Sequence, residues 1–417
     1  MGWSLAARSA ARDQLCPILL RGLPVLQHEG TSIERTCDLL SALRSTRFLA
    51  LLAAAVGGLA LATPSAAFAS PGHSQPAPPR DLKLHQVNLA SDLPGRAPVT
   101  DPDLKNPWGI SLAATSPLWV SNQGTDSSTL YSLAPGSTTA TKSTAVRVTM
   151  ADSVAGPTGQ VSNPGTGFVL SNATTSAPAA FIFATLDGHI EAWSPKVDPL
   201  IGNTEDKATV PGASYTGLAV AATRNGADEL FAANFGQGRV DVFDSAFHQV
   251  KLAHWQFRDP FLPKGYVPFN TQALNGNIFV TYDKVNHATG REATGRGLGV
   301  VDEYSPSGLL LRRIAAGGPL NAPWGLAIAP ATWGSAAGSL LIGNFGDGRI
   351  NIIATHGHGF VGHVTGQVRV AATGRPFAEP GLWGLLPGTA TTGGTSSLWF
   401  TAGINHEQDG LLGILQP

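Results

Sequence analysis

Apolar and polar residues recur along this chain in a repeated unit that begins with two short strands. The first strand carries a Pro-Trp-Gly motif or a weaker copy of it, most clearly at 106–110 and 322–326. The second strand is mostly apolar and ends on a polar turn, as at 118–122, 230–234 and 340–344. A repeat of roughly 50–60 residues built from strands is typical of a radial or stacked β array. The pattern therefore predicts an all-β fold made of repeats.

Six such units follow one another, and we expect four antiparallel strands in each complete one. Their approximate bounds are 104–152, 156–212, 215–267, 268–318, 320–375 and 380–417. The fifth unit is the clearest. Its strands are expected at 324–328, 339–343, 349–354 and 366–371.

The last unit has only three expected strands, whereas a spare alternating segment at 82–89 precedes the first unit. A circular array closes when its N-terminal strand completes the final blade, because closure removes the exposed sheet edges. We therefore predict a six-bladed β-propeller over residues 82–417, with the last blade closed by the N-terminal strand.

Residues 44–69 have the features of a secretory signal peptide. Arg44 and Arg47 precede an apolar stretch at 48–62, and a small-x-small site ends at Ala69. The alternative is a membrane anchor, but an uncharged stretch rich in Ala and Gly favours cleavage. We expect cleavage after Ala69, and hence a secreted or extracytoplasmic protein.

The segments on either side of this signal are assigned from their composition and length. Residues 70–81 form a Pro-rich spacer, and residues 1–43 are interpreted as an over-extended N-terminus, because signal peptides rarely follow so long a segment. No second apolar stretch of membrane length follows. We therefore expect no membrane span after signal cleavage.

Composition and charge exclude several classes of function. The net charge is −1 and no basic block occurs, so nucleic acid is not an expected partner. Both cysteines, Cys16 and Cys37, precede the signal, so we expect neither disulfides nor thiol catalysis in the mature chain. The zinc-protease, nucleophile-elbow and phosphate-loop motifs do not occur in the sequence.

Several motifs resemble those of known propellers. They include Asn106-Pro107-Trp108-Gly109, Asn344-Phe345-Gly346-Asp347-Gly348 and Leu398-Trp399-Phe400-Thr401-Ala402-Gly403. With these motifs the chain resembles the NHL-repeat and gluconolactonase-like six-bladed propellers, and more narrowly a family of secreted bacterial proteins of unknown function. The resemblance covers about residues 82–417. It implies a fold and a compartment rather than a reaction.

Polar residues at the strand ends are candidates for a binding site on the channel face, where the inner strands begin. The candidate ligand-binding asparagines are Asn106, Asn122, Asn234, Asn270, Asn321 and Asn344. Amide and carboxylate oxygens around an axis would suit Ca²⁺, which takes six to eight oxygen ligands. The alternative is turn chemistry, because Asn before Gly or Pro is common in turns and loops.

The same resemblance implies a more specific metal set. Gluconolactonase-like enzymes hold a divalent cation with a Glu, two Asn and an Asp. By blade position, Glu379, Asn234, Asn344 and Asp283 would take these roles. No local motif ties each residue to its counterpart. The only cofactor that the resemblance implies is Ca²⁺.

A long connection at 255–269 carries five aromatic residues around Arg258, Asp259 and Lys264. One interpretation is a loop that folds over the top of the channel and covers the core. The other is a lid or recognition loop, since long loops on rigid scaffolds often bind.

The sequence thus favours an exported binding or scaffold module that engages an extracellular or envelope ligand or protein through its channel face. The alternative is a divalent-cation-dependent, lactonase-like hydrolase with its site in the axial channel, where the cation would polarise a carbonyl group. The residues do not decide whether the protein is an enzyme.

Overall fold

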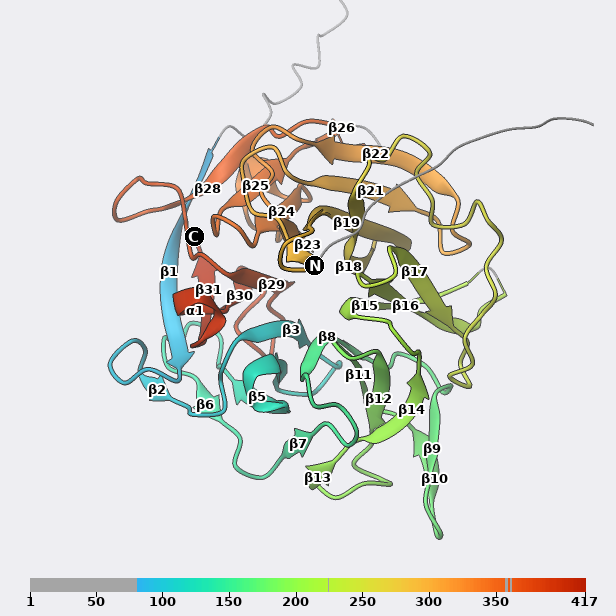
Figure 1. Ribbon diagram of the computed structural model, residues 1–417. Helices are drawn as coiled ribbons and strands as arrows, with labels where there is room; N and C mark the ends of the chain where they lie inside the picture. The colour runs from blue at the N-terminus through green and yellow to red at the C-terminus, as the bar shows by residue number, and fades with distance from the viewer. Residues whose placement is uncertain (1–80, 224, 357–358, 361) are drawn as a thin grey trace, which may run out of the picture. The chain divides into compact units, whose positions relative to one another are not determined.

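The computed structural model describes residues 81–223, 225–356, 359–360 and 362–417 (Figure 1). All of them fall within the unit His73–Pro417. The predicted N-terminal extension, the signal peptide with its cleavage after Ala69, and the spacer up to residue 80 lie outside the described residues. Within the described ranges, no helix has the length and apolar character needed to cross a membrane.

Six strands that carry the repeated motif gather around a common axis (Figure 1). Each lies beside the next, and the last lies beside the first. These inner strands are β3 (Pro107–Ser111), β8 (Pro157–Ser162), β15 (Tyr215–Ala222), β18 (Tyr266–Leu274), β23 (Pro323–Ile328) and β29 (Leu382–Pro387).

The glycine of the motif is explained by the close approach of these inner strands. A Cβ added at Gly109 would lie 2.5 Å from the carbonyl oxygen of Thr158 in the next inner strand. A Cβ at Gly325 would lie 2.5 Å from the carbonyl oxygen of Trp383. Real Cβ atoms do not come this close to backbone, so the repeated glycine is a packing requirement of the axis.

From each inner strand an antiparallel sheet extends outward. The first sheet continues with β4 (Leu118–Asn122) and β5 (Ser127–Ser132), and β6 (Thr141–Lys142) and β7 (Arg147–Thr149) both pair with β5. The second continues with β11 (Phe181–Thr185), β12 (His189–Trp193) and β14 (Glu205–Thr209). The third continues with β16 (Asp228–Asn234) and β17 (Arg239–Phe243).

The other three sheets are built in the same way. The fourth adds β19 (Asn277–Asn286), β21 (Val300–Tyr304) and β22 (Leu310–Ala316), and β20 (Arg291–Glu292) pairs with β19. The fifth adds β24 (Leu340–Asn344), β25 (Ile350–Ile353) and β28 (Gly366–Val370). The sixth adds β30 (Leu398–Ala402), β31 (Leu411–Gln416) and β1 (Asp81–Ser91), and β2 (Val99–Thr100) pairs with β1.

The remaining elements are short. They are β13 (Ile201–Asn203), which pairs with β7, the hairpins β9 (Val169–Ser171) with β10 (Ser176–Pro178) and β26 (Thr355–His356) with β27 (Gly359–Phe360), the turns η1 (Gln123–Thr125) and η2 (Gly334–Ala336), and α1 (Ile404–Glu407).

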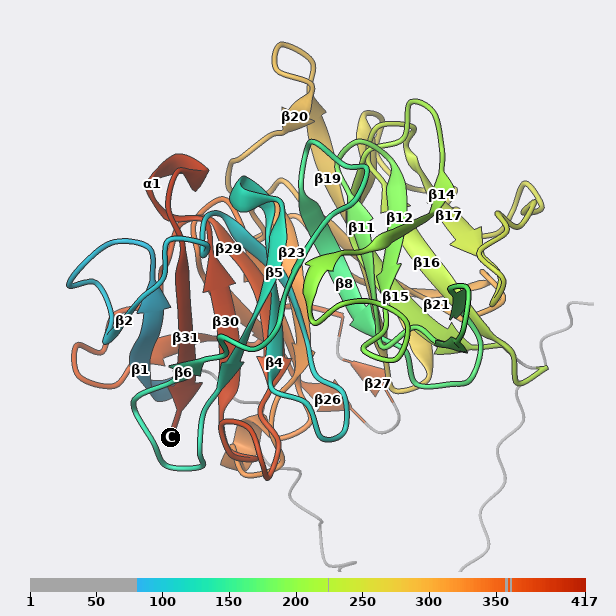
Figure 2. The same cartoon turned by 90° about the horizontal axis from the view of Figure 1, so that it is seen from below.

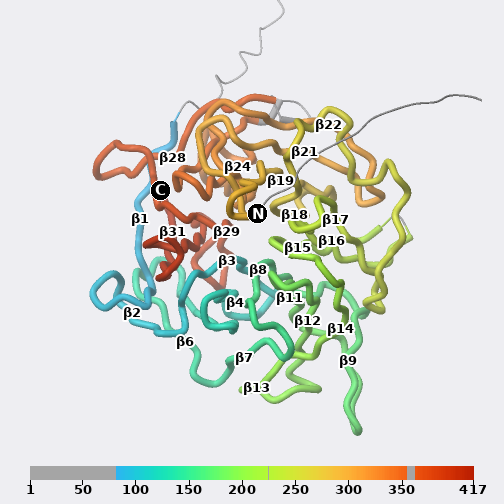
Figure 3. Tube along the Cα trace, in the orientation of Figure 1, coloured from blue at the N-terminus to red at the C-terminus, as the bar shows by residue number. Residues whose placement is uncertain are grey.

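The all-β prediction is confirmed, and the four strands expected in the fifth unit are present within one or two residues. The third sheet differs, because it contains three described strands instead of four. β1 pairs antiparallel with β31, and its first residues pair in parallel with β28 (Figure 3). That second pairing joins the fifth and sixth sheets through their outer strands and was not anticipated.

Aromatic side chains fill one end of the axis. This aromatic cluster comprises Trp108, Phe235, Phe269, Trp324, Phe345 and Trp383 together with Ala322. The rings of Trp108 and Trp383 stack with centroids 3.6 Å apart, and Phe345 stacks on Trp383 at 4.2 Å. Among the inner strands there remains a cavity of only about 10 Å³, at the lower limit for one water molecule. The axis is therefore a packed core rather than an open channel.

Candidate functional site

A cavity of about 940 Å³ opens above the aromatic cluster, and we call it the main cavity. Its walls come from segments far apart in the chain, and β20 and α1 project on the same side of the molecule (Figure 2). Phe345 of the aromatic cluster lines it from within. Its charged and polar side chains include Arg96, Asn286, Arg291, Glu292, Glu379, Asn405, His406 and Glu407.

A second cavity of about 270 Å³, the minor cavity, lies beside the first. The two share Arg291, Glu292 and Glu407 in their walls. The other residues that line the minor cavity include Trp108, Gln123, Leu186, Ser214, Thr216 and Phe235. Two residues of the aromatic cluster, Trp108 and Phe235, thus line it.

Arg291 connects the carboxylates of the shared wall. Its Nη2 lies 2.6 Å from Oε1 of Glu407 and 2.9 Å from Oε1 of Glu292. Burial raises the pKa of Glu292 above its ordinary value, although Arg291 acts in the opposite direction. Burial lowers the pKa of Arg291, but the two carboxylates outweigh that effect and raise it. The guanidinium therefore stays charged and holds both acids.

Backbone strain fixes the position of Glu407. Asn405, His406 and Glu407 have φ values of 52°, 56° and 67°, so three consecutive non-glycine residues adopt the left-handed conformation. Each such residue costs about 1–2 kcal/mol relative to the right-handed form. Strain of this kind persists only where surrounding contacts over-determine it, and it concentrates at functional sites.

Asn106 also holds this turn in place. Its Nδ2 donates to Oε2 of Glu407 at 3.1 Å and to Oε1 of Gln123 at 2.8 Å. Its Oδ1 accepts the indole N–H of Trp383 at 3.0 Å. Asn106 thus links the aromatic cluster to the shared wall of the two cavities.

Glu379 stands on the opposite wall of the main cavity. It accepts from Nη2 of Arg96 at 3.1 Å and from Nε2 of Gln86 at 2.7 Å. Its backbone lies against Gly348, where an added Cβ would be 2.1 Å from the Glu379 carbonyl carbon. The contact requires glycine at 348, and it fixes the backbone position from which the Glu379 side chain extends.

Two of the predicted asparagines form hydrogen bonds in and around the turns that they begin. Asn234 accepts the backbone N–H of Gln237 at 3.0 Å and donates to Asp241 at 2.7 Å. Asn344 donates to the carbonyl of Pro319 at 2.9 Å and to Asp347 at 3.0 Å. The matching turns that they begin place Phe235 and Phe345 in the aromatic cluster.

Three more predicted asparagines bond within the packed strands or to nearby loops. Asn122 donates to Thr129 at 2.9 Å, and Asn270 donates to the carbonyl of Trp324 at 2.8 Å. Asn321 accepts the backbone N–H of Gly295 at 2.6 Å. None of the six asparagines is among the residues that line the main or minor cavity.

The metal set suggested by the resemblance does not fit a Ca²⁺ ion in this arrangement. Asp283 is fully buried, and burial raises its pKa to about 8, so its carboxyl is largely protonated at neutral pH. Glu379 is paired with Arg96, while the amides of Asn234 and Asn344 are engaged in their turns. Among the described residues, no three His, Cys, Asp or Glu side chains are grouped as a metal site.

The predicted lid residues lie away from both cavities. Phe257 packs with Phe231 and Tyr304 on the flank of the third and fourth sheets, and its N–H donates to Gly308 in the turn after β21. The carboxylate of Asp259 contacts the Arg313 guanidinium. Arg258 and Lys264 are exposed. The connection therefore covers a flank of the sheets rather than the top of the channel.

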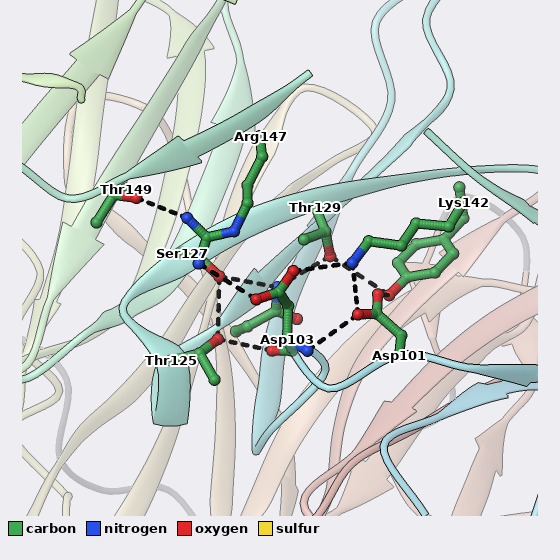
Figure 4. Close-up of polar contacts among 10 residues, drawn as sticks. Asp101, Asp103, Thr125, Ser127, Thr129, Lys142, Arg147 and Thr149 are labelled. Carbon is green, nitrogen blue, oxygen red and sulfur yellow. Dashed lines mark hydrogen bonds and ion pairs between the residues drawn. The ribbon is translucent and has the colours of Figure 1, made fainter. Parts of the chain in front are cut away.

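Another charged group lies in the first sheet (Figure 4). Lys142 pairs with Asp101 at 2.5 Å and with Asp103 at 2.8 Å, and Arg147 reaches Asp103 at 3.3 Å. Tyr131 donates to Asp101. Two acids and two bases neutralise one another here, and none of them lines the cavities described above. The group fastens the 101–103 segment to the first sheet.

Sequence reasoning missed Arg291, Glu292 and Glu407. One signal was present: residues 286–299 form a long insertion where the fifth unit has the five-residue turn 344–348. An insertion with adjacent opposite charges, on the side where propellers bind, could have indicated the shared wall.

No family model matches the sequence. Among solved structures, virginiamycin B lyase from Staphylococcus aureus is 12% identical, with 81% of this chain and 99% of that chain covered and a TM-score of 0.43. A gluconolactonase from Xanthomonas campestris is 13% identical, with 57% and 82% covered and a TM-score of 0.34. At these identities the likeness says nothing about activity.

Two proteins of Acanthamoeba polyphaga mimivirus are similar in sequence over most of their length. Uncharacterized protein R648 is 32% identical over 345 residues, which cover 81% of this chain and 82% of the relative. Uncharacterized protein L690 is 33% identical over 347 residues, covering 81% and 87%. These relatives are viral, whereas the sequence motifs predicted a bacterial family. The chain belongs to the family of these uncharacterised mimivirus proteins.

Proposed function

We propose that this protein binds a small, neutral, hydroxyl-rich molecule, such as a saccharide unit, in the main cavity at its channel face. We also propose that the six sheets are the blades of a closed six-bladed propeller. The circular order of the inner strands and the pairing of β1 with β31 support closure. A closed ring would hold the walls of the cavity at fixed positions.

The ion pairing of the main cavity carries the proposal, because each of its three carboxylates contacts one of its two guanidinium groups. Glu379 is paired with Arg96, and Glu292 and Glu407 are both paired with Arg291. An anionic ligand would need uncompensated basic groups, and a cation would need converging free carboxylates. A neutral ligand with several hydroxyl groups can donate to the carboxylates and accept from the guanidinium groups without breaking any of these three ion pairs.

The size and the apolar floor of the cavity point the same way. Ligand pockets commonly measure about 300–1,000 Å³ and combine apolar surface with a few oriented polar groups, and the main cavity of about 940 Å³ has both. Phe345 presents an aromatic ring among polar walls. An aromatic floor under polar walls suits a ring with apolar faces and polar edges.

Calorimetric titration of the full chain with monosaccharides tests the proposal. Glucose, galactose and mannose are compared with citrate, inorganic phosphate and CaCl₂. We expect at least one sugar to bind and Arg96→Gln to weaken it about tenfold, a loss near 1.4 kcal/mol. Arg369→Gln is the matched control, because Arg369 pairs with Asp81 at 2.7 Å outside the cavity. Binding confined to phosphate or citrate would overturn the proposal.

The lactonase-like hydrolase is the alternative that the calcium arm tests. None of the contacts described above favours it, because Glu379, Asn234 and Asn344 are engaged elsewhere and Asp283 is buried and largely protonated at neutral pH. Selective binding of Ca²⁺ that is lost in Asp283→Asn and Glu379→Gln would support it over a saccharide-binding module.

We further propose that the protein acts outside the cytoplasm. The signal-like segment at 44–69 supports export. N-terminal sequencing of the secreted product should find Ser70 as the first residue. Retention of the upstream peptide in a cytosolic fraction would contradict the proposal.

A further inference from the structure

We propose that the ligand has two ring-sized polar units joined by a short linkage, as in a disaccharide, with one unit in each cavity. This inference rests on the proposed function and extends it from one binding site to two adjoining subsites. The shared wall of Arg291, Glu292 and Glu407 would face the linkage between the two units.

The first support is that this wall separates the two cavities. Arg291 reaches from β20 of the fourth sheet to Glu407 next to the sixth sheet. The other residues of the main cavity come from the fifth and sixth sheets, β1–β2 and the insertion, whereas those of the minor cavity come mainly from the first three sheets. The two spaces therefore lie on opposite sides of one ion pair.

Each cavity has its own aromatic surface, which is the second support. Phe345 lines the main cavity, while Trp108 and Phe235 line the minor cavity. All three belong to the aromatic cluster, so the two surfaces are parts of one rigid layer. A ligand with two rings could rest one on each surface.

An unpartnered donor on Trp108, which lines the minor cavity, is the third support. The indole N–H of Trp108 is buried and has no hydrogen-bond partner among the described residues. A buried donor left unpaired costs about 1–3 kcal/mol, so such groups usually have a function. A hydroxyl oxygen of the second unit would accept this N–H.

Comparison of monosaccharides with disaccharides by calorimetry tests this inference. Glucose and galactose are compared with maltose, cellobiose and lactose on the full chain. We expect one disaccharide to bind at least about tenfold more tightly than its component sugars, because the second unit binds at high effective concentration. Leu186→Trp should fill the minor cavity and remove this advantage. It should reduce monosaccharide affinity much less than disaccharide affinity.

Two further variants keep the test decisive if Leu186→Trp folds poorly. Trp108→Phe removes the N–H but keeps an aromatic ring, and it should weaken disaccharide binding about fivefold more than monosaccharide binding. Thr294→Trp, which fills the main cavity, should weaken both. Monosaccharide binding without any gain for a disaccharide would overturn the two-subsite inference alone. No binding of any sugar would overturn the proposed function as well.

Discussion

Arg291 and Glu407 lie 116 residues apart and form an ion pair of 2.6 Å at the mouth of the axis. Arg291 comes from an insertion after the second strand of the fourth sheet, and Glu407 from a strained turn after the second strand of the sixth. The pair divides the space above the aromatic cluster into two cavities. Its partners, Glu292 and Asn106, extend it into a network that connects the surface to the core.

Two substitutions of Asn106 should distinguish the stability that its hydrogen bonds contribute from the cost of its left-handed backbone. Asn106→Gly keeps the left-handed backbone, with φ of 43°, but loses the bonds to Trp383 and Glu407. We expect a loss of about 1–3 kcal/mol of unfolding free energy, because the buried Trp383 indole loses its partner and Glu407 keeps only Arg291. Asn106→Ala should lose about 1 kcal/mol more, since it also adds left-handed strain. Equal stability of the two variants in urea titrations would contradict the assigned strain.

The two matching turns offer a comparison of glycines. Gly238 and Gly348 both have positive φ, at 66° and 68°. An added Cβ at Gly238 meets only a side-chain methyl of Val267 at 3.2 Å, whereas at Gly348 it meets the backbone of Glu379 at 2.1 Å. We expect Gly238→Ala to cost about 1 kcal/mol and Gly348→Ala clearly more. Only Gly348→Ala should also weaken sugar binding, because it displaces Glu379. Thermal melts and calorimetry of both variants check this.

Stability should depend on pH through Asp283. Burial raises the pKa of this carboxyl to about 8, against about 3.9 in an unfolded chain. Below about pH 4 both states are protonated. As pH rises toward 8, the unfolded state loses its proton first, so the folded state loses stability.

Asp283→Asn cannot ionise and lacks this dependence. The unfolding free energy of the variant minus that of the wild type should therefore increase by more than about 1.4 kcal/mol between pH 5 and pH 8. Urea denaturation at several pH values measures this difference, in which other titrating groups cancel. A constant difference would mean that the carboxyl is ionised in the folded protein.

The aromatic cluster should be a main source of stability. Trp383 is fully buried and contacts Trp108 and Phe345 by stacking. Trp383→Ala should cost about 3–5 kcal/mol, as expected for a large side chain removed from a packed core. Trp255→Ala is the control, because Trp255 is 48% exposed and should cost at most about 0.5 kcal/mol. Similar losses of unfolding free energy for the two variants in chemical denaturation would contradict a packed axis.

The strands could be predicted because their signals are local. The motif at 322–326 and the alternation at 340–344 each define a strand from its own residues, and β23 and β24 follow them closely. The last glycine of each of the turns 234–238 and 344–348 likewise indicates positive φ. Pattern and turn chemistry act over a few residues, so one sequence is enough to identify them.

The candidate site could not be predicted in the same way. Its central contact joins residues 116 positions apart, and no periodicity connects them. The turn at 405–407 contains no glycine. Asn405 and His406 are residue types that adopt positive φ more often than most, but nothing in the sequence indicates it for Glu407. The asparagines were expected to face a channel, but the aromatic residues of the same motifs fill that space and the amides bond inward. Tertiary packing decided these orientations.

Hydrogen–deuterium exchange on the full chain, with and without the tightest-binding sugar, tests the central claim most directly. Ligand contacts slow the opening of the backbone that they hold, so protection reports where the ligand binds. We expect slower exchange in peptides covering 286–294, 376–381 and 403–410, and no change in the exposed 253–265 connection. Protection confined to that connection, or to the outer strands, would contradict a binding site at the mouth of the axis.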